Sequence, residues 1–141
     1  MGLRAAEFCW IEIQMQQFSR QKITIIVAED IDAIRDLVCI KLVAAGYTVL
    51  PAANSRAALQ AAGDFGGPID LLLTDIDMPA GDGLELAKAL LKLHPRMRAL
   101  FMSGAYEPST AEILGEAAGR LFLLKPFSRE ELLHKVEDVL S

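Results

Sequence analysis

The stretch "LLLTDIDMPAGDG", Leu71 to Gly83, decides how the rest of the chain is interpreted. Its leading leucines predict a buried strand that ends at Asp75, and the Pro and Gly residues that follow predict a loop. A second acid, Asp77, lies in that loop two residues further on. Two carboxylates at the end of a buried strand raise the question of whether they act as a pair.

The whole chain has the size and composition of one globular domain. Its 141 residues are 52% hydrophobic and 23% charged, so they can bury a core without a metal or a disulfide. The net charge of −5 disfavours direct nucleic-acid binding, because there is no excess of Lys and Arg to displace counterions from a phosphate backbone. A protein or a small molecule is therefore the expected partner.

The cysteines and the N-terminus indicate a cytoplasmic chain. Cys9 and Cys39 lack the CxxC spacing of a zinc or redox site, so reduced thiols are expected. No apolar run approaches the roughly 18 residues that a membrane span needs. Glu7 and Glu12 interrupt any signal-peptide core. We expect no membrane attachment.

Short β-type runs alternate with helical stretches from Lys22 to the C-terminus. Strands are expected near residues 22–30, 47–52, 69–75, 97–103 and 120–126, and helices near 32–45, 54–62, 84–93, 108–118 and from 128 onward. The last helix is marked most clearly, because Ser128 and Glu131 form a capping box ahead of an apolar stripe. This alternation predicts an α/β fold, a doubly wound five-stranded parallel sheet with helices on both faces.

Residues 1–21 stand outside the alternating pattern and are expected to form an N-terminal extension. Phe8, Ile11, Met15 and Phe18 share one face if the segment is helical, so it would then dock on the domain or on a second copy. A disordered leader is the alternative. The sequence leaves both open.

Polar side chains follow the ends of four predicted strands. Glu29 and Asp30 follow the first strand, Asp75 ends the third, Ser103 ends the fourth and Lys125 ends the fifth. Ligands of open parallel sheets bind at the carboxyl ends of the strands, so these side chains are expected to converge at one edge. Carboxylates crowded in this way raise each other's pKa unless a cation joins them. Oxygen ligands without His or Cys suit Mg²⁺, or Mn²⁺, which shares its preference for oxygen.

These residues, in this order, resemble the receiver domains of two-component response regulators. The resemblance covers residues 22–141 and rests on the pair Glu29-Asp30, on "TDIDMPAGDG" with Asp75, on Ser103, and on "LLKPF" with Lys125. It implies a flavodoxin-like domain of the single-domain CheY-like type, which takes part in a two-component system or a phosphorelay.

The resemblance also assigns roles at the strand ends. Asp75 is expected to be the phosphoacceptor, attacking a phosphoryl group on a partner's histidine or on a small donor. Asp30 and Asp75 are expected to hold Mg²⁺ directly and Glu29 through water, with the backbone carbonyl of Asp77 completing the protein ligands. Mg²⁺ and Lys125 would neutralise the charge on the phosphoryl oxygens.

Further positions are expected to report or time the phosphorylated state. Ser103 would hydrogen-bond a phosphoryl oxygen, and Phe122 would act as the switch aromatic that packs inward. Asp77 and Ala105 would tune dephosphorylation. The bond between Lys125 and the proline that follows it corresponds to one that is cis in the family.

The implied partners are proteins. A histidine kinase or a histidine phosphotransfer protein would supply the phosphoryl group. A downstream protein would receive the signal, because no output domain is expected after the last helix. A homodimer is left open. The resemblance implies no enzyme activity beyond the domain's own phosphorylation and dephosphorylation.

Two alternatives use the same residues differently. In a phosphatase of the haloacid-dehalogenase type, Asp75 would be the nucleophile and Asp77 a general acid/base. The order of motifs speaks against this, because the acidic pair precedes the D-x-D motif here instead of following the lysine. A receiver-like interaction module that never carries phosphate is the other alternative, although the acids, the hydroxyl and the lysine are all retained.

Overall fold

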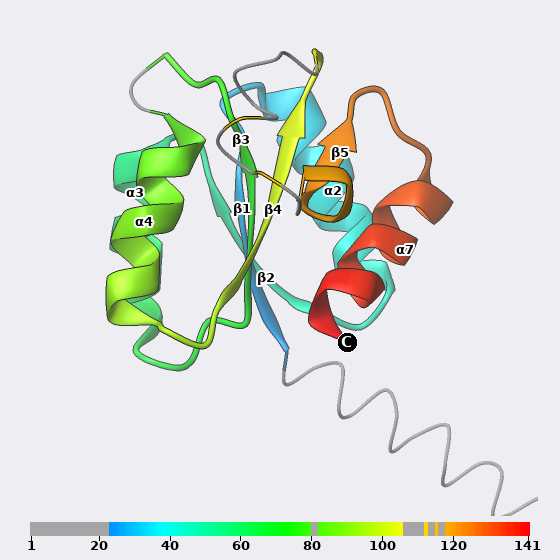
Figure 1. Cartoon of the computed structure of the whole chain (residues 1–141). Helices are drawn as coiled ribbons and strands as arrows, with labels where there is room; N and C mark the ends of the chain where they lie inside the picture. The colour runs from blue at the N-terminus through cyan, green and yellow to red at the C-terminus, as the bar shows by residue number, and fades with distance from the viewer. Residues whose placement is uncertain (1–22, 80–81, 106–111, 113–114, 116–117) are drawn as a thin grey trace, which may run out of the picture.

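The computed structural model describes residues 23–79, 82–105, 112, 115 and 118–141, and these form a sheet with helices on both faces (Figure 1). The strands are β1 (Thr24–Ala28), β2 (Thr48–Ala52), β3 (Leu71–Asp75), β4 (Arg98–Ser103) and β5 (Phe122–Leu124). The helices are α2 (Asp32–Ala44), α3 (Ser55–Phe65), α4 (Gly83–Leu93), α6 (Ala118–Leu121) and α7 (Arg129–Leu140). Across the described ranges, no helix is long and apolar enough to cross a membrane.

All five strands are parallel, in the order β2-β1-β3-β4-β5. Parallel neighbours need a crossover connection, which the intervening helices supply. The predicted doubly wound sheet is confirmed. The chain moves outward from β1 to β2 and then back to β3 on the other side of β1, so the crevice where ligands bind in such folds lies between β1 and β3.

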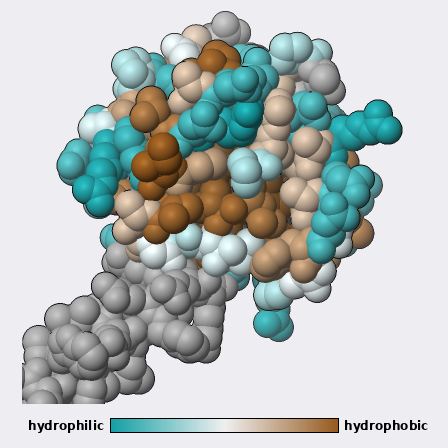
Figure 2. Space-filling model, turned by 180° about the vertical axis from the view of Figure 1, so that it is seen from behind, coloured by the Kyte–Doolittle hydropathy of each residue, from teal (hydrophilic) through white to brown (hydrophobic). Residues whose placement is uncertain are grey.

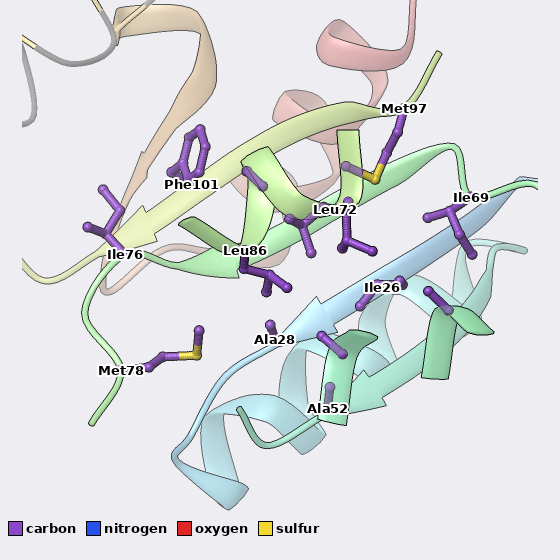
Figure 3. Close-up of a cluster of buried hydrophobic side chains, with 14 of the residues drawn as sticks. Ile26, Ala28, Ala52, Ile69, Leu72, Ile76, Met78, Leu86, Met97 and Phe101 are labelled. Atoms are coloured by element: carbon purple, nitrogen blue, oxygen red, sulfur yellow. The ribbon is translucent and has the colours of Figure 1, made fainter. Parts of the chain in front are cut away.

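The strands are buried on both faces, because successive side chains point to opposite sides of the sheet. Leu72 of β3 belongs to a cluster with residues of α3 and α4, whereas Leu71 and Leu73 belong to a second cluster with residues of α2 and α7. Figure 3 shows the first cluster, in which Leu72 lies on the same side of the sheet as Leu86 of α4. Two apolar layers therefore hold the sheet rigidly between the helices.

The predicted capping box of the last helix is confirmed. The side chain of Ser128 accepts a hydrogen bond from the backbone N–H of Glu131 at 3.1 Å, and the carboxylate of Glu131 accepts one from the backbone N–H of Ser128 at 3.4 Å. Both bonds satisfy N–H groups that have no partner inside the helix. The local sequence therefore fixes where α7 begins.

The fifth strand is shorter than the predicted range 120–126. Residues Ala118–Leu121 form α6, and β5 spans three residues that pair with β4 alone. A short apolar run is compatible with either a helix or a strand, so periodicity could not separate the two here. The helix predicted near 108–118 lies largely outside the described residues, as does the extension at residues 1–21.

The first residue of α4 packs directly against the end of β3. The backbone N–H of Gly83 donates a hydrogen bond to the carbonyl oxygen of Ile76 at 2.9 Å. A Cβ atom at this position would lie 2.1 Å from the carbonyl oxygen of Asp75, far inside van der Waals contact. Glycine therefore lets α4 begin this close to the strand that carries Asp75.

We predict that Gly83→Ala lowers the free energy of unfolding by about 1–3 kcal/mol or more, because the backbone of β3 or α4 has to move to make room for the methyl group. Gly63→Ala is the matched control, since a Cβ there meets nothing within 4 Å. Alanine favours the helix at that exposed position, so the control is expected to gain up to about 1 kcal/mol. Urea denaturation measures both, and equal midpoints for the two variants would contradict the close approach.

Candidate functional site

Strand register brings the predicted polar residues to one edge of the sheet. Ala28 of β1 lies beside Thr74 of β3, so Glu29 and Asp75 occupy neighbouring positions just beyond. Asp75 pairs with Met102, the residue before Ser103, and Ser103 pairs with Leu124, the residue before Lys125. The parallel sheet therefore collects residues that are far apart in the sequence.

Lys125 bridges two carboxylates at this edge. Its Nζ lies 2.6 Å from Oε2 of Glu29 and 2.8 Å from Oδ2 of Asp75. The Glu29 side chain is fully buried, and the other two side chains are largely buried. Charge-assisted hydrogen bonds of this length are strong where water is excluded, and the loss of one partner would leave an uncompensated buried charge.

The pKa shifts follow from this geometry. Burial raises the pKa of Glu29 and the charge of Asp75 adds to the rise, while the hydrogen bond and charge of Lys125 oppose it. Burial by itself would lower the pKa of Lys125, but its hydrogen bonds to Asp75 and Glu29 and their charges raise it above its ordinary value. Lys125 therefore stays protonated at neutral pH and cannot act as a base.

Three carboxylates lie close enough to share a metal ion. Glu29, Asp30 and Asp75 each offer one oxygen atom, and these atoms all lie within 4.8 Å of one another. With Lys125 as the partner cation, three negative charges meet one positive charge. An all-oxygen donor set with surplus negative charge suits a hard divalent cation such as Mg²⁺ or Mn²⁺.

Asp77 lies at the rim of this cluster. Its backbone N–H donates a hydrogen bond to Oδ1 of Asp75 at 3.1 Å, whereas its side chain is exposed. It lines a cleft together with Asp30 and with residues of the loop after β3. The two acids of the opening motif therefore occupy different environments, one buried in the ion pair and one facing solvent.

The remaining predicted residues lie on β4, on β5 and in the loops after them. Ser103 is buried at the end of β4, and its Oγ accepts a hydrogen bond at 3.2 Å from the backbone N–H of Ala105, which is exposed. Phe122 is buried beside Phe101, its neighbour across the β4–β5 pair. The peptide bond between Lys125 and the next residue is cis, as the resemblance implies.

Two residues that support the site were not singled out from the sequence. The Oγ1 of Thr74 is buried and donates a hydrogen bond to the carbonyl oxygen of Asp75 at 3.0 Å. The Nη1 of Arg35 donates one to the carbonyl oxygen of Glu29 at 2.8 Å. A signal for Arg35 existed, because it lies three residues before Val38 and so places a charge on the buried stripe of α2.

Comparison with known proteins gives a consistent result. A family model described as "Response regulator receiver domain" matches residues 25–137. The chain is 38% identical over 118 residues to Sensor kinase CckA of Brucella abortus (strain 2308), which covers 84% of this chain and 12% of that protein. It is 31% identical over 116 residues to Response regulator receiver protein CpdR of the same organism, which covers 82% of this chain and 95% of that protein.

A solved structure agrees with the same assignment. The response regulator protein TrrA from Thermotoga maritima, in complex with Mg(2+)-BeF, matches with a TM-score of 0.68 and 30% sequence identity. The match covers 84% of this chain and 99% of that one. The family model spans most of the chain, and the predicted fold is the observed one. The chain therefore belongs to the response regulator receiver family of two-component signalling.

Proposed function

We propose that this domain accepts a phosphoryl group on Asp75 from the phosphohistidine of a kinase or a histidine phosphotransfer protein. One observation carries the proposal, namely the buried Lys125 bridge between Glu29 and Asp75 beside Asp30. Receiver domains are typically non-catalytic signalling modules. We propose that this one, in the cytoplasm, catalyses its own phosphorylation and dephosphorylation alone and passes its state to a downstream protein.

The proposed metal ligands follow from the same cluster. Asp30 and Asp75 would hold Mg²⁺ directly, Glu29 would hold it through water, and the backbone carbonyl of Asp77 would complete the protein ligands. The ion would supply positive charge where negative charge develops on the phosphoryl oxygens. The spacing of the three carboxylates and the Mg(2+)-BeF complex of TrrA support this assignment.

The chain's own residues would position the transfer. A carboxylate oxygen of Asp75 forms the new O–P bond while the P–N bond to the donor histidine breaks, and the imidazole takes the electron pair of that bond. Lys125 is held close to Asp75 by its second bond to Glu29, so its charge is in place before the phosphoryl group arrives. The buried setting of the ion pair strengthens this electrostatic effect.

The proposed switch begins at Ser103. Its hydroxyl is bonded within its own loop, to the N–H of Ala105. That bond uses a lone pair of the Ser103 oxygen, so the O–H group would still donate to a phosphoryl oxygen on Asp75 and draw this segment toward the phosphate. Phe122 is buried beside Phe101 and has no hydroxyl group, so it would report the change through packing alone.

We predict that acetyl phosphate with Mg²⁺ adds one phosphoryl group to the wild-type protein, as measured by intact mass. Asp75→Asn removes the nucleophilic oxygen and is expected to abolish the gain. Asp64→Asn, at an exposed carboxylate on α3, is the matched control and is expected to label fully. Rapid turnover of phosphate esters would instead favour the phosphatase, and a wild type that gains no mass would indicate the inert interaction module.

We predict that Asp77 times the loss of the phosphoryl group. Its backbone N–H contacts Asp75, and its exposed carboxylate lines the cleft that Asp30 also lines, where it would either orient an attacking water or repel it. Asp77→Asn keeps a hydrogen-bond acceptor but removes the charge, whereas Asp77→Ala removes both. At least one half-life is expected to change by about threefold, which corresponds to roughly 0.7 kcal/mol in the barrier. Intact mass follows the decay of the phosphorylated form, and Ala105→Asn is measured as a further variant. Equal half-lives in the wild type and all variants would contradict the role in dephosphorylation.

The phosphodonor is proposed to dock on α2. Leu37, Ile40 and Val43 of this helix are 56%, 65% and 58% exposed. Figure 2 shows apolar side chains gathered on the side of the molecule that α2 covers. A predominantly apolar groove lies between α2 and the segment after β5, and both Leu37 and Lys125 line it. Because Lys125 also contacts Asp75, a partner helix in this groove would lie next to the phosphoacceptor.

We predict that Ile40→Asp lowers the rate of transfer from a histidine kinase that labels the wild type by about tenfold or more, because a charge replaces an apolar contact. Labelling by acetyl phosphate is expected to stay within about twofold, since a small donor does not need the docking face. Leu93→Asp is the matched control, because Leu93 is 69% exposed at the end of α4. Equal loss with both donors, or equal loss in the control, would refute docking on α2.

A further inference from the structure

The connection between β1 and α2 carries two of the three clustered carboxylates. β1 ends at Ala28 and α2 begins at Asp32, so Glu29 and Asp30 lie in a three-residue turn. Ile31 precedes α2, and its apolar side chain cannot cap the helix by a hydrogen bond. Its backbone N–H instead donates a hydrogen bond to Oε1 of Glu29 at 3.3 Å. The path of this short turn therefore decides where both carboxylates lie.

Arg35 reaches back from α2 to this turn. Its Nη1 donates a hydrogen bond to the carbonyl oxygen of Glu29 at 2.8 Å, and its Nη2 lies 2.6 Å from Oδ1 of Asp32. The planar guanidinium suits such a double contact, because its donors are fixed relative to one another. The backbone N–H of Glu29 donates to the carbonyl oxygen of Ala52 on β2 at 3.0 Å. Both backbone groups of Glu29 are thus held from opposite sides, one by the sheet and one by Arg35.

The ion pair with Asp32 does not explain why most of the Arg35 side chain is shielded from solvent. The side chain of Arg35 is 16% exposed, whereas that of Asp32 is 84% exposed. An ion pair with one partner in open solvent contributes little. The bond to Glu29 is different, because Glu29 is fully buried. Loss of the donor would leave its carbonyl oxygen without this partner, and the turn would shift to satisfy it.

We propose that Arg35 is a positioning residue for the metal-binding carboxylates. It acts through the backbone of Glu29, whose carbonyl oxygen it binds. The side chain of the same residue contacts Lys125 in the site at 2.6 Å. With the guanidinium in place, Glu29 and Asp30 keep their spacing to Asp75 in the absence of a cation. The inference rests on the proposed metal site and extends it to a residue outside the cluster.

The test measures metal affinity directly, on the full chain below its unfolding temperature. Electron paramagnetic resonance of free Mn²⁺ gives the Kd of the wild type and of each variant. Arg35→Gln is expected to weaken Mn²⁺ binding about tenfold or more, as changes to groups that orient metal ligands do. Arg35→Lys keeps the charge but loses the paired donors of the guanidinium, so its Kd for Mn²⁺ is expected to lie between those of the wild type and Arg35→Gln. Asp32→Ala is the matched control and is expected to stay within about twofold, because it leaves the bond to Glu29 in place.

The outcomes separate three cases. A lower unfolding temperature with an unchanged Mn²⁺ Kd in the Arg35 variants would reduce Arg35 to a structural role and overturn the inference. Equal weakening in Asp32→Ala would overturn it as well, because the exposed ion pair would then be the contact that matters. A wild type that binds Mn²⁺ no better than Asp30→Asn would refute the metal site itself, and the inference with it. If Arg35→Gln does not fold, the comparison of Arg35→Lys with Asp32→Ala still decides.

Discussion

The arrangement of this domain depends on one buried ammonium between two carboxylates. Lys125 contacts both Glu29 and Asp75, and a third acid, Asp30, lies within reach of the same point. Burying charges is costly unless each one finds a partner, and here the positive charge balances part of the negative charge only. The surplus carboxylate makes the site unfavourable when empty and favourable for a cation. In the proposed function, metal binding and phosphorylation at this point would set the switch.

The backbone around the ion pair is constrained from several sides. Gly83 allows α4 to begin against the carbonyl of Asp75, and Thr74 donates a hydrogen bond to that same carbonyl. Arg35 and the last residue of β2 hold the two backbone groups of Glu29. These contacts carry no chemistry of their own. In the proposed function they would fix the carboxylates in space, which matters because electrostatic stabilisation depends on groups that are placed before the reaction begins.

Lys125 also links recognition to chemistry. It lines the apolar groove beside α2 and, at the same time, contacts the phosphoacceptor candidate Asp75. A partner in the groove would therefore meet the same side chain that is proposed to neutralise the transferred group. In the proposed function, this geometry allows one surface to select the donor and to place its phosphoryl group, without a separate binding module.

The amino-acid sequence was enough to predict the parallel sheet, the polar residues at the strand ends and the capping box of α7, because each depends on a local pattern of apolar, acidic and turn-forming residues. It did not mark where β5 begins, since a short apolar run suits a helix and a strand equally. The pairing of Lys125 with Glu29, 96 residues away, and the bond from Arg35 to the same residue became visible in the folded chain alone. Such contacts depend on strand register and helix packing, and neither can be predicted from a local sequence pattern. The structure also separated Asp75 from Asp77, because burial places one in an ion pair and leaves the other in solvent.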